Sequence, residues 1–181
     1  MIYVFLAKGF EEIEALTVVD CLRRAELEVY TVGIGGKIIT GSHNIPVFCD
    51  LDENEISTSD AIDAVVLPGG MPGTLNLEAN KTVNDFIDYC VQNDKYVCAI
   101  CAAPSILGHK GLLKGRKACC FPGFENELEG ATVSEDFVCT DGKYITAKGM
   151  GAAIEFSREI TRALLDDFTA DRIKASLQCP F

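Results

Sequence analysis

The sequence predicts an α/β fold in which helices cover a mostly parallel sheet. Short, almost continuous apolar runs recur along the chain, as in strands buried on both faces of such a sheet. Amphipathic segments with helical spacing separate these runs. Strands that alternate with helices form parallel sheets whose functional sites lie at the carboxyl ends of the strands.

The first half of the chain shows this alternation directly. MIYVFLA (1–7) is typical of a buried strand, and residues 11–25 carry apolar side chains three positions apart, as in a helix packed on a sheet. LEVYTVGI (27–34) predicts the second strand. Between Lys37 and Cys49, two short apolar runs joined by Gly and Asn predict a hairpin outside the main sheet.

The second half repeats the pattern and ends on a hairpin and helices. AVVLPGG (64–70) and YVCAI (96–100) predict strands on either side of an amphipathic helix at 81–93. The Asp-Gly turn at 141–142 predicts a β-hairpin within FVCTDGKYITA (137–147). Helices are expected from about 151 to 165 and over 169–178.

Composition indicates one globular domain over residues 1–181. The 181 residues are 48% hydrophobic, which suffices for one substantial core. No apolar stretch approaches the roughly 20 residues that span a bilayer, and no basic region precedes a long apolar segment near the start. We expect a cytoplasmic protein without a membrane partner.

The net charge of −11 opposes contact with phosphate backbones, so no nucleic-acid partner is expected.

The nine cysteines favour free thiols in a reducing compartment. Most lie inside apolar runs, where a thiol packs as a small hydrophobe, and the chain lacks the small, loop-rich pattern of a disulfide scaffold. The two histidines have no neighbouring cysteine at zinc-ligand spacing. We therefore expect neither a metal nor an organic cofactor.

VCAICAAPSILG (97–108) poses the main functional question. A redox dithiol is one interpretation of its two cysteines, but on an extended strand Cys98 and Cys101 lie about 10 Å apart, beyond the ~7 Å limit for a disulfide. The alternative is a strand that ends at Cys101, small neighbours, and a helix immediately after. That layout is a nucleophile elbow, in which the helix N-terminus lowers the thiol pKa. A buried structural cysteine is the simpler possibility.

Two further segments are expected beside this thiol. LPGGMPG (67–73) follows a strand with a glycine-rich turn, so the amides of Gly70 and Ala102 are candidates for an oxyanion hole. AKGFEEIEA (7–15) places three carboxylates at the start of the first helix. Favourable interaction with the helix dipole explains Glu11 and Glu12, whereas Glu14 is a candidate to face the cleft.

Four segments together resemble the ThiJ/PfpI superfamily, specifically its Parkinsonism-associated deglycase branch. They are AKGFEEIEA, VVLPGGMPGTLNL, AICAAPSILG and AKGMGAAIEF, in this order. The resemblance implies a flavodoxin-like three-layer sandwich, usually homodimeric. It also implies that Cys101 is the reactive thiol, that Glu14 is the acid bonded to it, and that Gly70 and Ala102 occupy the family's positions beside it.

The histidine positions depart from that family. Peptidase-like members carry a histidine directly after the cysteine, where this chain has Ala102, and deglycase relatives often carry one at the position of Phe121. His43 lies in the expected hairpin and His109 is expected at the surface, so a Cys-His pair is not predicted.

Two functions follow from the same thiol. In the first, Cys101 adds to a small dicarbonyl such as methylglyoxal or to its protein adduct, Glu14 shuttles the proton, and Gly70 and Ala102 hold the oxyanion. In the alternative, the protein is a redox sensor or chaperone-type binding protein with little turnover, in which Cys101 is oxidised.

Overall fold

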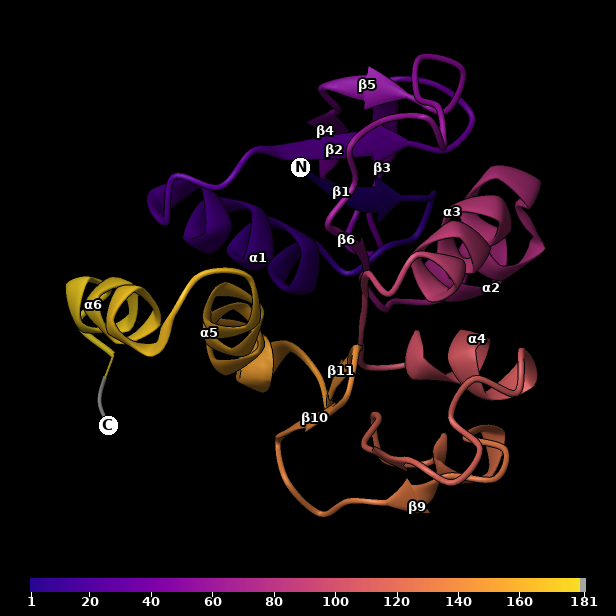
Figure 1. Ribbon diagram of the computed structural model, residues 1–181. Coiled ribbons are helices and arrows are strands. Elements are labelled where there is room, and N and C mark those ends of the chain that lie inside the picture. Colours follow the sequence, from indigo (N-terminus) through magenta and orange to yellow (C-terminus); the bar gives the residue numbers. More distant parts are fainter. Residues whose placement is uncertain (180–181) are drawn as a thin grey trace.

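The computed structural model describes residues 1–179, which form a three-layer α/β sandwich around one seven-stranded sheet (Figure 1). The strand order is β10-β11-β7-β6-β1-β2-β5, and every adjacent pair is parallel except β10 with β11. The strands of this sheet are β1 (Ile2–Leu6), β2 (Val29–Gly33), β5 (Leu51–Asp52), β6 (Ala64–Leu67), β7 (Tyr96–Ile100), β10 (Val138–Asp141) and β11 (Tyr144–Ala147). The predicted fold class is confirmed.

Alternate residues of each central strand face opposite layers. Phe5 and Leu67 pack in the core on one side of the sheet, while Val4 and Val66 pack in the core on the other. Because both faces are covered, these strands are apolar at every position, which is the pattern seen in the sequence.

Helices form the two outer layers, one on each face of the sheet (Figure 1). One side holds α1 (Glu12–Arg24), α5 (Ala153–Leu164) and α6 (Asp167–Ser176), and the other holds α2 (Gly73–Ala79), α3 (Lys81–Gln92) and α4 (Pro104–His109). β2 pairs with one edge of β1, and β6, which comes later in the chain, pairs with the opposite edge of β1. The carboxyl ends of β1 and β6 therefore border a crevice where the strand order reverses.

The predicted excursion is a separate hairpin. Strands β3 (Ile38–Thr40) and β4 (Pro46–Phe48) pair antiparallel outside the main sheet, and β8 (Lys117–Ala118) pairs with β9 (Thr132–Val133) in another small sheet. Two 3₁₀ turns, η1 (Glu125–Glu127) and η2 (Met150–Ala152), complete the elements.

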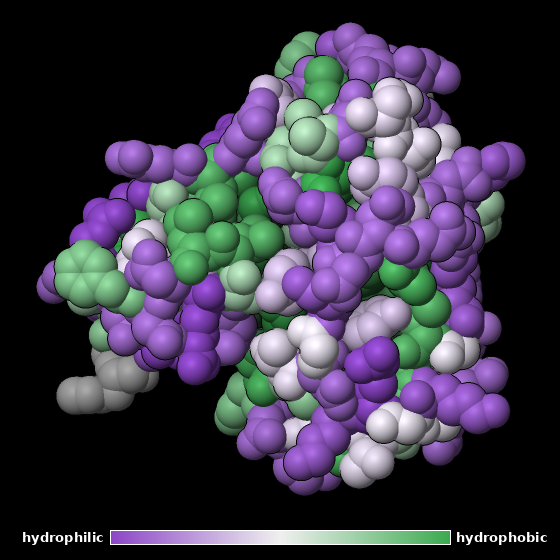
Figure 2. All heavy atoms as spheres, viewed as in Figure 1, coloured by the Kyte–Doolittle hydropathy of each residue, from purple (hydrophilic) through white to green (hydrophobic). Residues whose placement is uncertain are grey.

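Hydrophilic residues dominate the face shown in Figure 2, with an apolar area over the region between α1 and α5. Among residues 1–179, no helix combines the length and the apolar character that crossing a membrane requires.

Candidate functional site

Cys101 stands on a strained turn between strand and helix. It follows β7 directly and has φ +65°, in the left-handed region that non-glycine residues rarely occupy. Its amide donates to Ala147 O at 2.8 Å, and its carbonyl accepts from Phe121 N at 2.8 Å. These two hydrogen bonds hold the strained backbone from both sides, so the side chain leaves the sheet edge in a fixed direction.

The residues around the Cys101 thiol are small, as the close approach of strand and helix in a nucleophile elbow requires. Ala102 and Ala103 are buried beside Cys101, and α4 begins at Pro104 after this short turn. Gly69, in the turn that follows the neighbouring strand β6, lies against the thiol, because a Cβ added there would lie 2.5 Å from Cys101 Cβ and 3.0 Å from Sγ. Cys98, by contrast, is fully buried within β7, and both thiols are free. The structure therefore favours the elbow over the dithiol.

Glu14 reaches the same point from the first turn of α1. Its side chain is fully buried, and its Oε2 accepts a hydrogen bond from Gly69 N at 2.9 Å. A Cβ on Gly69 would lie 2.7 Å from this oxygen, so carboxyl and thiol meet above the same glycine. Oε1 is buried without a hydrogen-bond partner. A buried oxygen that accepts no hydrogen bond lowers the stability of the fold, unless a bound ligand donates a hydrogen bond to it.

Two backbone amides point to the sulfur. The amides of Gly70 and Ala102 both favour the thiolate form of Cys101. Gly70 has φ +90°, and a Cβ there would lie 2.5 Å from Glu11 N, so only glycine fits this turn. The structure thus brings together all four residues singled out in the sequence: Cys101, Glu14, Gly70 and Ala102.

Carboxyl and thiol perturb each other's proton affinity. Burial raises the pKa of Glu14 to about 7, although hydrogen bonds from the Cys101 thiol and the Gly69 amide oppose the rise. Burial and the neighbouring Glu14 carboxylate raise the pKa of Cys101 to about 12, against the effect of the two amides. The expected lowering of the thiol pKa is therefore wrong, because burial and the acid outweigh the short helix. A thiolate forms here when the proton moves to Glu14.

Neither histidine forms a pair with Cys101. Both ring nitrogens of His109, at the end of α4, are bonded to carboxylates, Nδ1 to Glu78 at 2.5 Å and Nε2 to Glu127 at 2.8 Å. His43 lies in the β3–β4 turn, where its Nδ1 is 3.1 Å from Glu12 Oε2. The two sequence predictions for these residues agree with this placement.

Glu11 and Glu12 have a role that the sequence did not indicate. Both are buried beneath the β3–β4 turn, where Glu12 accepts from His43 N at 2.8 Å and Ser42 Oγ donates to Glu11 at 3.0 Å. Although burial opposes it, hydrogen bonds from its own amide, His43 and Ser42 lower the pKa of Glu12 to about 2. One donor atom from each of Glu11, Glu12 and His43 lies within 4.8 Å of the others. Their visible function is to anchor the hairpin to α1.

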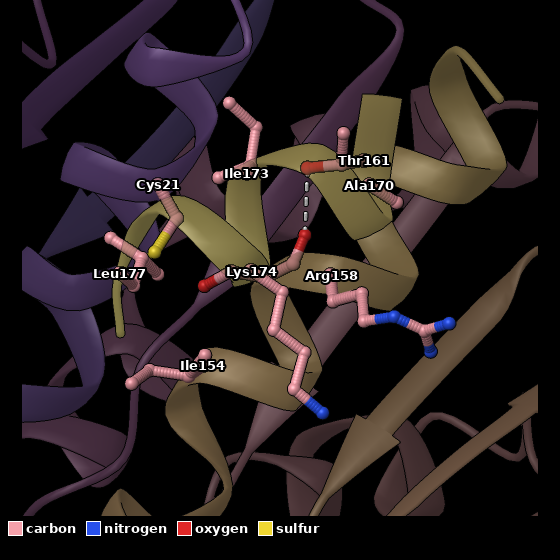
Figure 3. A pocket seen from close by; sticks show the side chains of 9 residues that line it. Cys21, Ile154, Arg158, Thr161, Ala170, Ile173, Lys174 and Leu177 are labelled. Atoms are coloured by element: carbon pink, nitrogen blue, oxygen red, sulfur yellow. Dashed lines mark hydrogen bonds between the residues drawn. The ribbon is translucent and has the colours of Figure 1, made fainter. Parts of the chain in front are cut away.

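A separate gap lies between α1, α5 and α6 (Figure 3). Its lining includes Cys21, Ile154 and Leu177, and Thr161 turns its hydroxyl to the Ser157 carbonyl at 2.9 Å. The volume of about 10 Å³ holds no more than one water molecule. It is a packing defect between helices and contributes nothing to the Cys101 site.

Comparison with known proteins identifies relatives along almost the whole chain. The family model described as DJ-1/PfpI family matches residues 1–163. The chain is 32% identical to the Parkinson disease protein 7 homolog of Danio rerio, covering 96% of this chain and 94% of that protein. It is 31% identical to Deglycase PfpI of Pyrococcus furiosus, covering 87% and 95%.

A solved structure shares the fold closely. Oxidized DJ-1 of Toxoplasma gondii superposes with a TM-score of 0.95 at 30% identity, covering 99% of this chain and 98% of that one. Sequence and structure agree, and the chain belongs to the DJ-1/PfpI family.

Proposed function

We propose that this protein is a cysteine-dependent enzyme that detoxifies small α-oxoaldehydes such as methylglyoxal, or their adducts on proteins, without a cofactor. The observation that carries the proposal is the convergence of the Cys101 thiol, the Glu14 carboxyl and the amides of Gly70 and Ala102. The name of the Pyrococcus furiosus relative, a deglycase, is consistent with it.

The chemistry uses these groups in sequence. Cys101 sulfur attacks the aldehyde carbon, the C=O π bond breaks, and the oxygen takes the proton from Glu14 to give a hemithioacetal. The Glu14 carboxylate then removes the hydrogen from that carbon to give an enediolate. The hydroxyl proton moves to the neighbouring oxygen, and Glu14 returns its proton to the neighbouring carbon, which yields a thioester of the 2-hydroxy acid. Water cleaves the thioester and regenerates the thiol. The aldehyde carbon is oxidised and its neighbour reduced, so no external oxidant is needed.

The amides of Gly70 and Ala102 serve the steps in which negative charge develops. They already face the sulfur, and an oxygen on the attacked carbon would lie within reach of the same donors. The raised pKa of Glu14, about 7, suits a group that donates and accepts a proton near neutrality.

Turnover of methylglyoxal tests the proposal. We expect purified protein to form lactate without glutathione, Cys101→Ala to form none above background, and Glu14→Gln to lose about 100-fold or more in kcat, as expected for general acid–base groups. Cys179→Ala, at the other half-buried cysteine, is the matched control and should retain full activity. Equal lactate from wild type and Cys101→Ala would eliminate the proposal.

An oxidation sensor is the second candidate, and a specific observation favours it. The Toxoplasma gondii relative is described as oxidized. Here hydrogen peroxide would convert the Cys101 thiolate to a sulfenate, and a second equivalent would convert the sulfenate to a sulfinate, each step releasing water. Glu14 and the two amides lie beside the sulfur that gains these oxygens. A selective gain of two oxygens at Cys101 under mild peroxide, with negligible dicarbonyl turnover, would favour the sensor.

A further inference from the structure

An apolar hollow opens next to the reactive pair. It has a volume of about 220 Å³ and is lined mainly by carbon atoms, including those of Phe121, Pro122, Phe137 and Met150. Phe121, Phe137 and Met150 are 43%, 69% and 45% exposed, although each is a large hydrophobic side chain. We name this hollow the Phe121 pocket.

The pocket adjoins Cys101 through the backbone. Phe121 donates its amide to the Cys101 carbonyl at 2.8 Å, and Lys148 and Gly149 follow Ala147, whose carbonyl accepts from the Cys101 amide at 2.8 Å. Both walls of the pocket are therefore positioned by the two hydrogen bonds that hold the elbow.

The unpartnered oxygen of Glu14 lies on the pocket side of the carboxyl. A Cβ built on Gly149 would lie 3.2 Å from the Phe121 ring and 3.7 Å from Glu14 Oε1. The side chain of Phe121 and this buried oxygen therefore flank the same position, and glycine at 149 places no carbon atom between them. Gly69 N donates to Oε2, so Oε1 is the oxygen of this carboxyl that lies nearer to the pocket wall.

The lining determines what the remainder of that molecule should be. Lys148 is the cation at the rim, but its ammonium donates to Glu135 O at 2.7 Å and lies 5.6 Å from the centre of the Phe137 ring. Lys148 therefore contributes its ammonium to contacts within the pocket rim. A cavity of about 150 Å³ with apolar walls binds benzene, so this one accommodates a phenyl group.

We propose that the Phe121 pocket receives an apolar aryl or branched alkyl substituent, so that Cys101 prefers α-oxoaldehydes such as phenylglyoxal over methylglyoxal. This inference rests on the proposed reactivity of Cys101 and specifies its substrate class. The substituent lies against Phe121, Phe137 and Met150 while the carbonyl group lies beside the partly exposed Cys101.

Alkylation rates test the pocket without requiring turnover. The second-order rate at Cys101 is measured by peptide mass analysis for iodoacetamide and N-benzyliodoacetamide, each normalised to its rate with free cysteine at the same pH. We expect the normalised ratio to favour the benzyl reagent about tenfold or more, the scale on which apolar pockets discriminate.

Three variants locate the preference. Phe137→Ser removes an exposed wall, and Gly149→Ala adds a methyl group that presses on the Phe121 ring, so both should reduce the ratio about fivefold or more. Phe168→Ser, at a 77% exposed phenylalanine on α6, is the matched control and should leave the ratio unchanged. A wild-type ratio near one, or a ratio that Phe137→Ser and Gly149→Ala leave intact, overturns the inference.

Turnover separates this inference from the proposed function. We expect kcat/KM for mandelate formation from phenylglyoxal to exceed that for lactate formation from methylglyoxal, and Phe137→Ser to diminish the difference. A benzyl preference without turnover of either aldehyde would retain the pocket and eliminate the enzyme. If both aldehydes are turned over with equal kcat/KM and alkylation shows no benzyl preference, the enzyme is retained and the pocket is eliminated.

Discussion

Cys101 and Glu14 share one environment and compete for one proton. Both side chains are largely withdrawn from water, so ionising either is costly, and ionising both places two negative charges side by side. The thiolate form of the pair is the one in which Glu14 carries the proton and the amides of Gly70 and Ala102 face the sulfur. The amount of thiolate therefore depends on how the pair divides its proton, more than on the helix that follows.

The pH dependence of stability should reveal the buried carboxyl. The folded-state pKa of Glu14, about 7, exceeds its ordinary value of 4.5, so its contribution to stability is complete below pH 4.5 and is lost as pH rises through 7. Glu14→Gln removes this loss. We expect urea unfolding to show that the free energy of unfolding of the variant, relative to that of wild type, increases by about 3 kcal/mol between about pH 4 and pH 8.

Glu12→Gln is the contrasting control for that measurement. Its folded-state pKa is lowered to about 2, so its contribution is present above pH 4.5 and is lost as pH falls toward 2. This variant should be less stable than wild type at neutral pH and approach it in acid. A Glu14→Gln difference that stays constant over the whole range would contradict a raised Glu14 pKa.

Gly69 is the residue on which the geometry of the pair depends most directly. An added Cβ would lie 2.5 Å from Cys101 Cβ and 2.7 Å from Glu14 Oε2, so Gly69→Ala must displace one of them. We expect iodoacetamide labelling of Cys101 to change its rate by about tenfold or more, together with a lower melting temperature. Gly151→Ala, where an added Cβ meets nothing within 4 Å, should leave both unchanged.

At the scale of elements, sequence patterns predicted the longer strands and helices better than the short elements between them. β7 lies over the predicted residues 96–100 because five apolar residues that follow charged Lys95 fit a short buried strand. α2 was missed, because GTLNLEA follows a glycine- and proline-rich turn and is too short for a helical period to be evident. β5 has two residues and carries no pattern of its own.

The sequence predicted which residues lie close to Cys101, but it did not predict the direction of the pKa shift of the thiol. Cys101, Glu14, Gly70 and Ala102 follow from motif and strand-end logic, whereas the direction of the thiol pKa depends on burial depth, which a linear sequence does not contain. The burial of Glu11 and Glu12 depends in the same way on the β3–β4 hairpin folding back onto α1. The Phe121 pocket joins segments that are distant in sequence.

His109 connects three elements and should make their packing pH-dependent. Hydrogen bonds to Glu78 on α2 and Glu127 on η1 raise the pKa of this histidine, so its stabilising contribution is complete below pH 6.5 and is lost as pH rises above that value. His109→Gln should cost on the order of 1 kcal/mol near pH 6, since both pairs are partly exposed, and less near pH 9. Urea unfolding at both values checks this, and a difference that grows with pH would contradict it.

At the scale of the whole molecule, we propose a homodimer formed through α1 and the β3–β4 hairpin. Glu12 joins these two elements, and beside it they expose large apolar side chains. These are Ile13, Leu16, Ile38, Ile45 and Phe48, which are 38% to 73% exposed. Apolar side chains gathered on adjacent elements are typical of an interface.

Light scattering after size exclusion tests this assembly. Phe48→Lys, at the most exposed of these residues, should convert a dimer of about 39 kDa, twice the chain mass of 19.6 kDa, to a monomer. Phe168→Lys on α6 is the control and should remain dimeric. A monomeric wild type at micromolar concentration would exclude the proposal.

The distribution of the thiols has a consequence for following how the molecule opens. Seven of the nine are buried, and they are divided among the layers, with Cys21 in α1, Cys98 in the central sheet and Cys90 in α3. Each becomes modifiable only when its own layer separates from its neighbours. Timed modification in mild denaturant would thus record, residue by residue, the order in which the layers separate, with no cysteine added by mutation.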